Sequence, residues 1–399
     1  MRKVQLFLFA ATLLPAQTLV LEHANVIDGI SAQPQLGMTV TVRDGRIESI
    51  QSGDHMVPSS ATVLDLKGKW LLPGYIDAHV HIGTLQAAHT ALLSGVTTAR
   101  SMGVSHYVDV GFRELHRNGD FDIPDFIAAG YHVRPHPAEE LFLDFPRLID
   151  LMHGVSGTAA VRRVVKANLD HGVQVIKILA TERAGTPDTD PRKRTFTDDE
   201  MAAIVDEAKS AGLSVAAHAH GDEGAAGAVR AGVRSIEHGT YISDATLAEM
   251  KERGTYLVPT LATIYDLIEP SGDHHNAALS IRARHMLPRA KETTSHAHAM
   301  GIKIVAGTDT GYGPTSNLRI PHEIAELVQV GLTPMEAIQS ATSIAAECLG
   351  IANRTGSIRP GLEADMVVVE RNPLNEVAGL ADVLLVINDG KVALNRLAW

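Results

Sequence analysis

The 399-residue sequence has very little cysteine and few aromatic residues. Its single cysteine, Cys348, cannot form an intramolecular disulfide, and it has no second thiol for a cysteine-type metal site. It lies in a helical pattern, "ATSIAAECLG", where we expect a buried structural thiol. Aromatic residues make up 4%, the net charge is -11, and no basic cluster is interleaved with aromatics. These features disfavour a nucleic-acid partner and predict a small, diffusible substrate instead.

Two catalytic motifs are also missing. No G-x-S-x-G stretch is present, which disfavours a serine hydrolase. The segment "PHEIAEL" lacks the second histidine of the helical metalloprotease motif, so His322 and Glu323 are interpreted as helix or pocket residues. A hydrophobic content of 45% over this length argues against disorder and predicts a folded core.

Long apolar runs are limited to the N-terminus. Arg2 and Lys3 precede an apolar run from Val4 to Leu14, which is too short to span a bilayer but has the length of a signal-peptide core. We therefore expect residues 1–17 to be a signal peptide and the mature chain to be periplasmic or secreted. A frayed first strand is the alternative. No other segment is long and apolar enough to predict a membrane span.

Two chain regions have the texture of a small β domain. Alternating runs fill residues 18–70, with "RDGR" at 43–46 typical of a hairpin turn, and similar runs return in residues 357–399. Because these regions lie at opposite ends of the chain, we expect a β-sandwich domain built from both ends. The intervening residues, 71–356, would form a separate unit.

That middle region alternates strand-like runs with helical patterns. Thr197 with Glu200 and Thr333 with Glu336 have capping-box spacing, which predicts helix starts. The eight strand candidates are "PGYIDAHVH", "VTTARSMG", "DFIAAGY", "VQVIKILAT", "LSVAAHAHG", "SIEHG", "TYLVPTL" and "IKIVAGTDTG". Eight strand-then-helix units predict an α/β fold of the (β/α)8 TIM-barrel type, with a doubly wound sheet as the alternative.

Unusual polar residues fall at the ends of these strands. In "LLPGYIDAHVHIG", Asp77, His79 and His81 alternate, so they would share one face of an otherwise apolar strand. In a barrel, the C-terminal strand ends meet at one mouth. A lone strand histidine is usually structural, but histidines and an aspartate gathered at one mouth are ligands for zinc-like ions. The candidates are His79, His81, Lys177, His218, His220, His238 and Asp309.

Lys177 is the most informative candidate, because apolar residues surround it in "VQVIKILAT". Burial would remove solvation from an ammonium and lower its pKa. A neutral amine can react with carbon dioxide to give a carbamate, an anionic ligand with two oxygens. Alternatively, the ammonium reaches the barrel mouth and pairs with Asp309 or a substrate carboxylate. The strand context leaves both interpretations open.

The combination of "DAHVH", "IKILAT", "AHAHG", "SIEHG" and "GTD" resembles the amidohydrolase superfamily, in particular its imidazolonepropionase-like and Xaa-Pro or Xaa-Arg dipeptidase branch. The resemblance extends to "GSIRPGLEADMVVVERNP" and covers nearly the whole mature chain. It implies two zinc ions per chain. By analogy, His79, His81 and Asp309 would hold one ion, His218 and His238 the other, and carboxylated Lys177 would bridge them.

The sequence departs from this family where substrate would bind. His220 stands where relatives often have a substrate-binding tyrosine, and the segment 128–146 replaces an expected glycine-rich loop. His132, Arg134 and His136 in that segment, with Tyr265 after the seventh strand, are further candidate substrate-binding residues. Arg134 could hold a carboxylate by a bidentate contact. Surface or structural roles for these side chains stay open.

The resemblance implies hydrolysis of amide bonds in dipeptides or N-acyl amino acids. Two metals would share a hydroxide, and Asp309 would carry the proton from the attacking water to the leaving nitrogen. A cyclic-amide hydrolase or deaminase of the same superfamily is the main alternative, although mononuclear deaminases generally lack the bridging lysine. A catalytically inactive barrel that binds a metabolite or stores metal is a second alternative. Relatives are often homo-oligomers.

Overall fold

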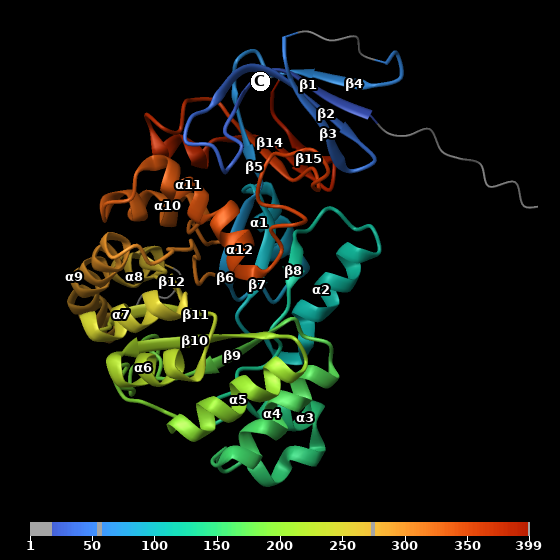
Figure 1. The fold of residues 1–399 in the computed structure, drawn as a ribbon. Coiled ribbons are helices and arrows are strands. Elements are labelled where there is room, and N and C mark those ends of the chain that lie inside the picture. The colour runs from blue at the N-terminus through green and yellow to red at the C-terminus, as the bar shows by residue number, and fades with distance from the viewer. Residues whose placement is uncertain (1–17, 54–57, 273–275, 398–399) are drawn as a thin grey trace, which may run out of the picture.

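The computed structural model describes residues 18–53, 58–272 and 276–397. The expected signal peptide, residues 1–17, lies outside the described residues. No helix within the described ranges is both long and apolar enough to cross a membrane. Figure 1 shows a sheet made from both ends of the chain at one end of the molecule, beside a larger part in which strands and helices alternate.

The sheet from the two chain ends has eight strands, ordered β15-β14-β13-β5-β1-β2-β3, with β4 paired to β1. Asp44 and Gly45, both with positive φ, make the predicted turn between β2 and β3. The strands are β1 Thr18–Val26, β2 Gln35–Arg43, β3 Arg46–Ser52, β4 Thr62–Asp65, β5 Trp70–Pro73, β13 Met366–Val369, β14 Val383–Asn388 and β15 Lys391–Asn395.

These strands form one branched hydrogen-bonded sheet and not two separate sheets, as the expected sandwich would require. The branching occurs at β1, which pairs with β4 over Leu19–Glu22 and with β5 over Asn25–Val26. Register shifts on either side of Ala24 bend β1 between these two partners. Its inward side chains, including Leu21 and Val26, pack in a core separate from that of the larger part.

The larger part contains seven parallel strands in two sheets. Its strands are β6 Tyr75–Val80, β7 Val96–Ser101, β8 Asp125–Ile127, β9 Val175–Leu179, β10 Ser214–Gly221, β11 Ser235–Tyr241 and β12 Tyr256–Val258. Parallel bridges join the two sheets: Val133 to Ile178 on one side, and Leu257 to Ile304 followed by Thr310 to Val80 on the other. The arrangement is therefore TIM-barrel-like, and not an open doubly wound sheet.

The expected eighth strand, "IKIVAGTDTG" at 302–311, forms only the isolated bridges at Ile304 and Thr310. Two local features prevent a regular ladder. Asp309 has a φ of 54°, outside the β region. Gly307 passes so close to β6 that a Cβ there would lie 2.8 Å from the Cβ of His79.

Helices surround the parallel strands (Figure 1). Both predicted capping boxes, at Thr197 and Thr333, are present, and Cys348 is buried as expected. The helices are α1 Leu85–Leu93, α2 Val108–Arg117, α3 Glu139–Asp144, α4 Thr158–Asp170, α5 Asp198–Ser210, α6 Asp222–Ala231, α7 Asp244–Arg253, α8 Leu261–Ile268, α9 Ala277–Ala299, α10 Ile320–Gln329, α11 Pro334–Ser340 and α12 Ser343–Leu349. Short 3-10 turns span Ser105–Tyr107, Pro146–Leu151 and Val377–Ala381.

A buried carboxyl group, Asp365, lies immediately before β13, where the sheet joins the larger part. Its Oδ1 accepts a hydrogen bond from the backbone N–H of Asp389 (2.9 Å), and its Oδ2 accepts one from the Thr355 hydroxyl (2.7 Å). Burial and the nearby charge of Asp389 raise the pKa of Asp365 from 3.8 to about 7. The native state therefore holds this proton at pH values where the unfolded chain has lost it.

This proton makes stability depend on pH. As pH rises from about 4 to about 7, the raised pKa of Asp365 destabilises the native state, because ionisation is easier in the unfolded chain. Asp365→Asn keeps the acceptor and removes the titration. Between pH 5 and pH 8, we expect the free energy of unfolding of the wild type to fall by roughly 2 kcal/mol more than that of Asp365→Asn. Denaturant unfolding at both pH values measures this, with exposed Asp382→Asn as the control. Equal losses in Asp365→Asn and wild type would contradict the assignment.

Candidate metal centre

The polar residues singled out at the strand ends line one cavity of about 460 Å³ at the C-terminal ends of the parallel strands. His79 and His81 come from β6 and the residue after it, Lys177 from β9, His218 and His220 from β10, and His238 from β11. Asp309 comes from the bridged segment after β12. All seven residues line the cavity, so the structure brings together the complete set that the sequence predicted.

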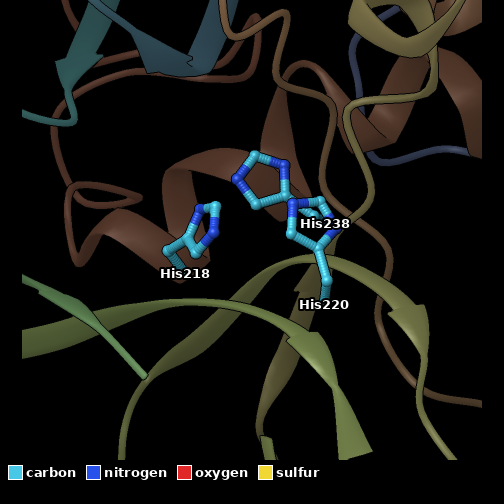
Figure 2. Close-up of side chains that lie close together, drawn as sticks. All are labelled: His218, His220 and His238. Atoms are coloured by element: carbon cyan, nitrogen blue, oxygen red, sulfur yellow. The ribbon is translucent and has the colours of Figure 1, made fainter. Parts of the chain in front are cut away.

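Within the cavity, the ligand atoms fall into two overlapping groups that share His238. His79, His238 and Asp309 form one group, and His218, His220 and His238 form the other, with all ligand atoms of a group within 4.8 Å of one another. Figure 2 shows the three histidines of the second group close together, with ring centroids 4.5 to 4.8 Å apart. Both groups have the donor types and the spacing for a divalent ion.

Hydrogen bonds on the outer ring nitrogens orient the histidines of β6. The Nδ1–H of His79 donates to Oε2 of Glu237 (2.8 Å), and that of His81 donates to the carbonyl of Gly103 (2.8 Å). Each ring therefore presents Nε2 to the cavity. There, Oδ1 of Asp309 lies 3.4 Å from the Nε2 of His79 and 3.1 Å from the Nε2 of His81.

The histidines of β10 and β11 are oriented by threonines. Nδ1 of His238 hydrogen-bonds to Oγ1 of Thr260 (2.7 Å), and Nδ1 of His220 to Oγ1 of Thr240 (2.9 Å). Both rings thus also present Nε2. Such outer partners fix the ring orientation and the tautomer of metal-binding histidines.

His218 is oriented in the opposite sense. Its Nε2 lies 3.2 Å from the backbone carbonyl of Glu182, so it donates there and leaves Nδ1 available. Burial is the main cause that lowers the pKa of His218 and of His238 well below the usual value. Both imidazoles are therefore neutral at physiological pH, which is the form that binds metals.

Lys177 is buried, with only 2% of its surface exposed, and its Nζ forms no hydrogen bond with any described residue. Burial lowers the pKa of Lys177 to about 8, although the charges of Glu237 and Asp309 oppose this shift. The carboxylate of Asp309 contacts histidines instead of this amine. A buried amine without a partner is costly, which sets Lys177 apart from the hydrogen-bonded histidines around it.

Glu237 and Arg100 were not identified from the sequence, although both support the site. The fully buried Glu237 carboxylate accepts from Nη2 of Arg100 (2.9 Å) and from Oγ of Ser235 (2.5 Å), in addition to His79. Arg100 and His79 lower the pKa of Glu237 to about 2 despite its burial. Each has a signal in the sequence, because Glu237 directly precedes His238 and Arg100 is the one charged residue of β7.

Asp77 is buried but supports the bridged segment instead of lining the cavity. Its Oδ1 accepts from the backbone N–H groups of Thr308 (3.0 Å) and His79 (3.2 Å). Its Oδ2 accepts from the hydroxyls of Thr308 (2.6 Å) and Tyr312 (2.8 Å). These four hydrogen bonds satisfy the buried carboxylate of Asp77, the first residue of "DAHVH". They also hold the segment that carries Asp309.

The backbone is strained at three site residues. His238, Thr260 and Asp309 have φ values of 75°, 50° and 54°, in the left-handed region that non-glycine residues rarely adopt. Strain of this kind persists where surrounding contacts over-determine the conformation, and it is common at functional sites. Here two of the three residues offer ligand atoms, and Thr260 orients His238.

The candidate substrate-binding residues occupy different places. His220 lines the metal cavity, and so does His132, whose ring centroid lies 5.8 Å from that of His81. Arg134 and His136 line an adjacent cavity of about 410 Å³ instead. Both cavities are close enough to share wall residues, so Arg134 lies within reach of the metal cavity's mouth.

Tyr265 does not line the metal cavity, which corrects its interpretation as a residue of that pocket. It turns to the other side of α8, lines a separate cavity of about 300 Å³ with His322, and accepts a hydrogen bond from Nζ of Lys291 (2.5 Å). Glu323 caps the start of α8 by accepting from the N–H groups of Leu261 and Ala262. His322 and Glu323 are thus helix residues, as expected.

Another group of cavity residues was not identified from the sequence. Arg183 follows the fourth strand and lines the metal cavity at its rim. The apolar part of the wall comes from β9, α8 and α9, and consists of Leu179, Ile264, Leu267, Leu279 and Met286. Such helix residues carry no local signal that separates a cavity wall from ordinary core.

Comparisons with known proteins agree with this geometry. The model of the amidohydrolase family matches residues 70–393. Ochratoxinase from Aspergillus niger is 32% identical over 222 residues, covering 55% of this chain and 46% of that protein, so the match spans less than half of its length. Imidazolonepropionase from Geobacillus kaustophilus is 26% identical over 402 residues, covering 90% of each chain. A solved Xaa-Pro dipeptidase with bound methionine in the active site has a TM-score of 0.84, with 29% identity and coverage of 94% and 99%.

The contact between Glu237 and His79 predicts an effect on metal affinity. Glu237→Gln would remove the charge that orients His79 and would leave Arg100 buried without its counter-charge. We expect zinc affinity to fall by about 10- to 100-fold, measured by competition with a chelator. Glu292→Gln, an exposed carboxylate paired with Arg289, is the matched control and should keep wild-type affinity. Unchanged affinity in Glu237→Gln, with an intact fold by circular dichroism, would show that this contact does not support a metal.

Proposed function

Because the chain belongs to the amidohydrolase family, we propose that it is a binuclear zinc enzyme that hydrolyses amide bonds of small substrates, either dipeptides or N-acyl amino acids. The observation that carries the proposal is the buried amine of Lys177, which has no hydrogen-bond partner among the described residues and lines the same cavity as five inward-facing imidazoles and Asp309. A lysine with a structural role would form an ion pair through Nζ. A carbamate that bridges two metals would instead lie among imidazole and carboxylate ligands, as Lys177 does.

The residues present fit such a centre. His79, His81 and Asp309 would hold one zinc ion, and His218 and His238 the other. The neutral Lys177 amine would attack carbon dioxide, forming an N–C bond and losing a proton, and the resulting carbamate would bridge both ions. This ligand set contains only imidazole nitrogens and anionic oxygens, which suits zinc. It also removes the uncompensated buried amine.

In the reaction, each protein residue has a separate role. Bound zinc supplies a Lewis acid for the amide carbonyl and makes water nucleophilic near neutral pH. Asp309 lies 3.1 Å from the Nε2 of His81 and 3.4 Å from that of His79, and it would accept the proton of the attacking water. It would then donate that proton to the leaving nitrogen. His220 and the apolar wall would position the substrate.

The same family membership supports a finer description of the fold. We take the bridged ring as a closed (β/α)8 barrel within residues 71–356, with the segment 302–311 as its eighth strand. The bridges at Ile304 and Thr310 support this, because they connect that segment to the strands on both sides.

Release of free amino acid from a library of dipeptides and N-acyl amino acids tests the reaction. We expect the zinc-loaded enzyme to cleave a related set, and Asp309→Asn to lower kcat by at least about 10³-fold, because the proton carrier is lost. Zinc content, measured in the same samples, is the control for loss of metal. Turnover of cyclic amides alone, with two zinc ions per chain, would favour the alternative that the similarity to imidazolonepropionase suggests.

Replacement of Lys177 tests the bridging ligand. We expect Lys177→Ala to hold fewer zinc ions and to lose activity, and a short carboxylate such as acetate to restore part of both by occupying the vacated space. In the wild type, ¹³C-bicarbonate should give a carbamate signal by NMR that Lys177→Ala lacks. Full zinc content in Lys177→Ala, with no carbamate signal in the wild type, would exclude the carbamate.

A further inference from the structure

Two arginines at the mouth of the metal cavity lack a partner. Arg134 follows β8 and Arg183 follows β9, and both line the same two small cavities beside the metal centre. Neither guanidinium forms a hydrogen bond or an ion pair with the residues that the structure describes. Arg192, on the same loop as Arg183, instead pairs with Asp190 (3.1 Å). Arg183 also lines the metal cavity itself, so its free donors are available to a molecule bound there.

The two side chains are close enough to affect each other electrostatically. Burial and the positive charge of Arg183 lower the pKa of Arg134. Two adjacent cations without a counter-ion are unfavourable on their own, and an anion between them would relieve the repulsion. A guanidinium presents a planar fork that matches a carboxylate.

The neighbouring carboxylates do not neutralise this pair. Glu182 is engaged by Lys193 at 2.7 Å and by the backbone N–H of Asp190 at 2.9 Å. Glu140 offsets part of the effect on Arg134 but forms no ion pair with it. Asp188 and Arg183 both line the larger adjacent cavity and are both exposed to solvent, and Asp188 forms no ion pair with either arginine. The mouth therefore keeps a net positive charge, in a chain whose overall charge is -11.

The loop that carries Arg183 is held by a side chain of α9. Arg282 of α9 spans to this loop, and its two terminal nitrogens donate four hydrogen bonds to backbone carbonyls. The acceptors are Ala184 (2.6 Å), Thr186 (2.7 Å), Pro187 (2.8 Å) and Thr189 (2.7 Å). Arg183 is the residue directly before this clamped stretch. A fixed loop loses little conformational entropy when a ligand binds.

The side chains that α8 and α9 contribute to the cavity are apolar apart from Thr263. Ile264 and Leu267 come from α8, and Leu279 and Met286 from α9. The cavity thus offers three surfaces: a cationic mouth, a metal centre and an apolar wall. A ligand that contacts all three carries a carboxylate, an amide and a bulky apolar group.

On this basis we propose that Arg134 and Arg183 bind the free α-carboxylate of the substrate, and that the substrates are N-acyl amino acids whose acyl group is bulky and apolar. The inference rests on the proposed function, because the scissile amide would lie at the zinc centre. The leaving amino acid points to the arginines, and the acyl group packs against α8 and α9. Both arginines are substrate-binding residues, and Arg282 positions Arg183.

Binding of an uncleavable ligand pair tests this inference separately from catalysis. The pair consists of 2-benzyl-4-oxo-4-phenylbutanoic acid, in which a methylene replaces the amide nitrogen of N-benzoylphenylalanine, and its primary carboxamide. We expect the zinc-loaded wild type to bind the acid about 10- to 100-fold more tightly than the carboxamide in calorimetry, as for hydrogen bonds to a charged group.

Matched variants identify the residues responsible. Arg183→Ala and Arg134→Ala should each lose most of the preference for the acid while binding the carboxamide as the wild type does. Arg192→Ala removes a positive charge from the same loop outside the cavities and should keep the full preference. Equal affinity of the wild type for both ligands, no binding of either, or a full preference in both cavity variants would overturn the inference.

The proposed function can fail independently of this result. If the acid is preferred and no amide in the library is hydrolysed, the carboxylate site stands and the reaction is wrong. If N-benzoyl-L-phenylalanine and its amide are cleaved with equal kcat/KM, the reaction stands and the carboxylate site is wrong. When both hold, Arg183→Ala should raise KM for the acid and change kcat little.

Discussion

The buried amine of Lys177 is the constraint on which the rest of the site depends. It lies in the fourth strand of a tightly packed ring, with no hydrogen-bond partner among the described residues. Burial disfavours a charged amine there, and the nearby charges of Glu237 and Asp309 offset this only in part. The chain surrounds it with imidazoles and the carboxylate of Asp309, which are donor types suited to a divalent metal ion. Stability and chemistry thus impose the same requirement on these positions.

Support for that set comes from outside the cavity. The Glu237 carboxylate connects His79 to Arg100, so strands β6, β7 and β11 are joined by one buried network beneath the centre. Asp77 performs a similar role for the bridged segment through Thr308 and Tyr312. The positive φ values at His238 and Asp309 are tolerated because these hydrogen-bond networks hold the backbone in that conformation.

Local patterns were sufficient to predict most elements and the polar residues that line the cavity, but not the partners that orient those residues. "DAHVH", "AHAHG" and "GTD" each carry their polar residues at a strand end, where parallel topology alone brings them together. The roles of Glu237, Arg100 and Arg183 depend on contacts between distant segments, so their places in the sequence mark them as unusual without giving their partners. Tyr265 was assigned to the wrong pocket, because the rotation of α8 decides which face of that helix meets the cavity. The segment 302–311 is predicted as a regular strand, but it forms only isolated bridges, because hydrogen bonds from Thr308 to Asp77 hold it in an irregular path.

Helix α9 connects the apolar lining of the cavity to the loop that carries Arg183. Leu279, Arg282 and Met286 recur at intervals of three and four residues, so one face of the helix carries both apolar contacts and the loop clamp. A slide or rotation of this helix would change the depth of the hydrophobic wall and the position of the cationic loop together. A substitution that moves α9 would therefore alter two parts of the cavity lining at once.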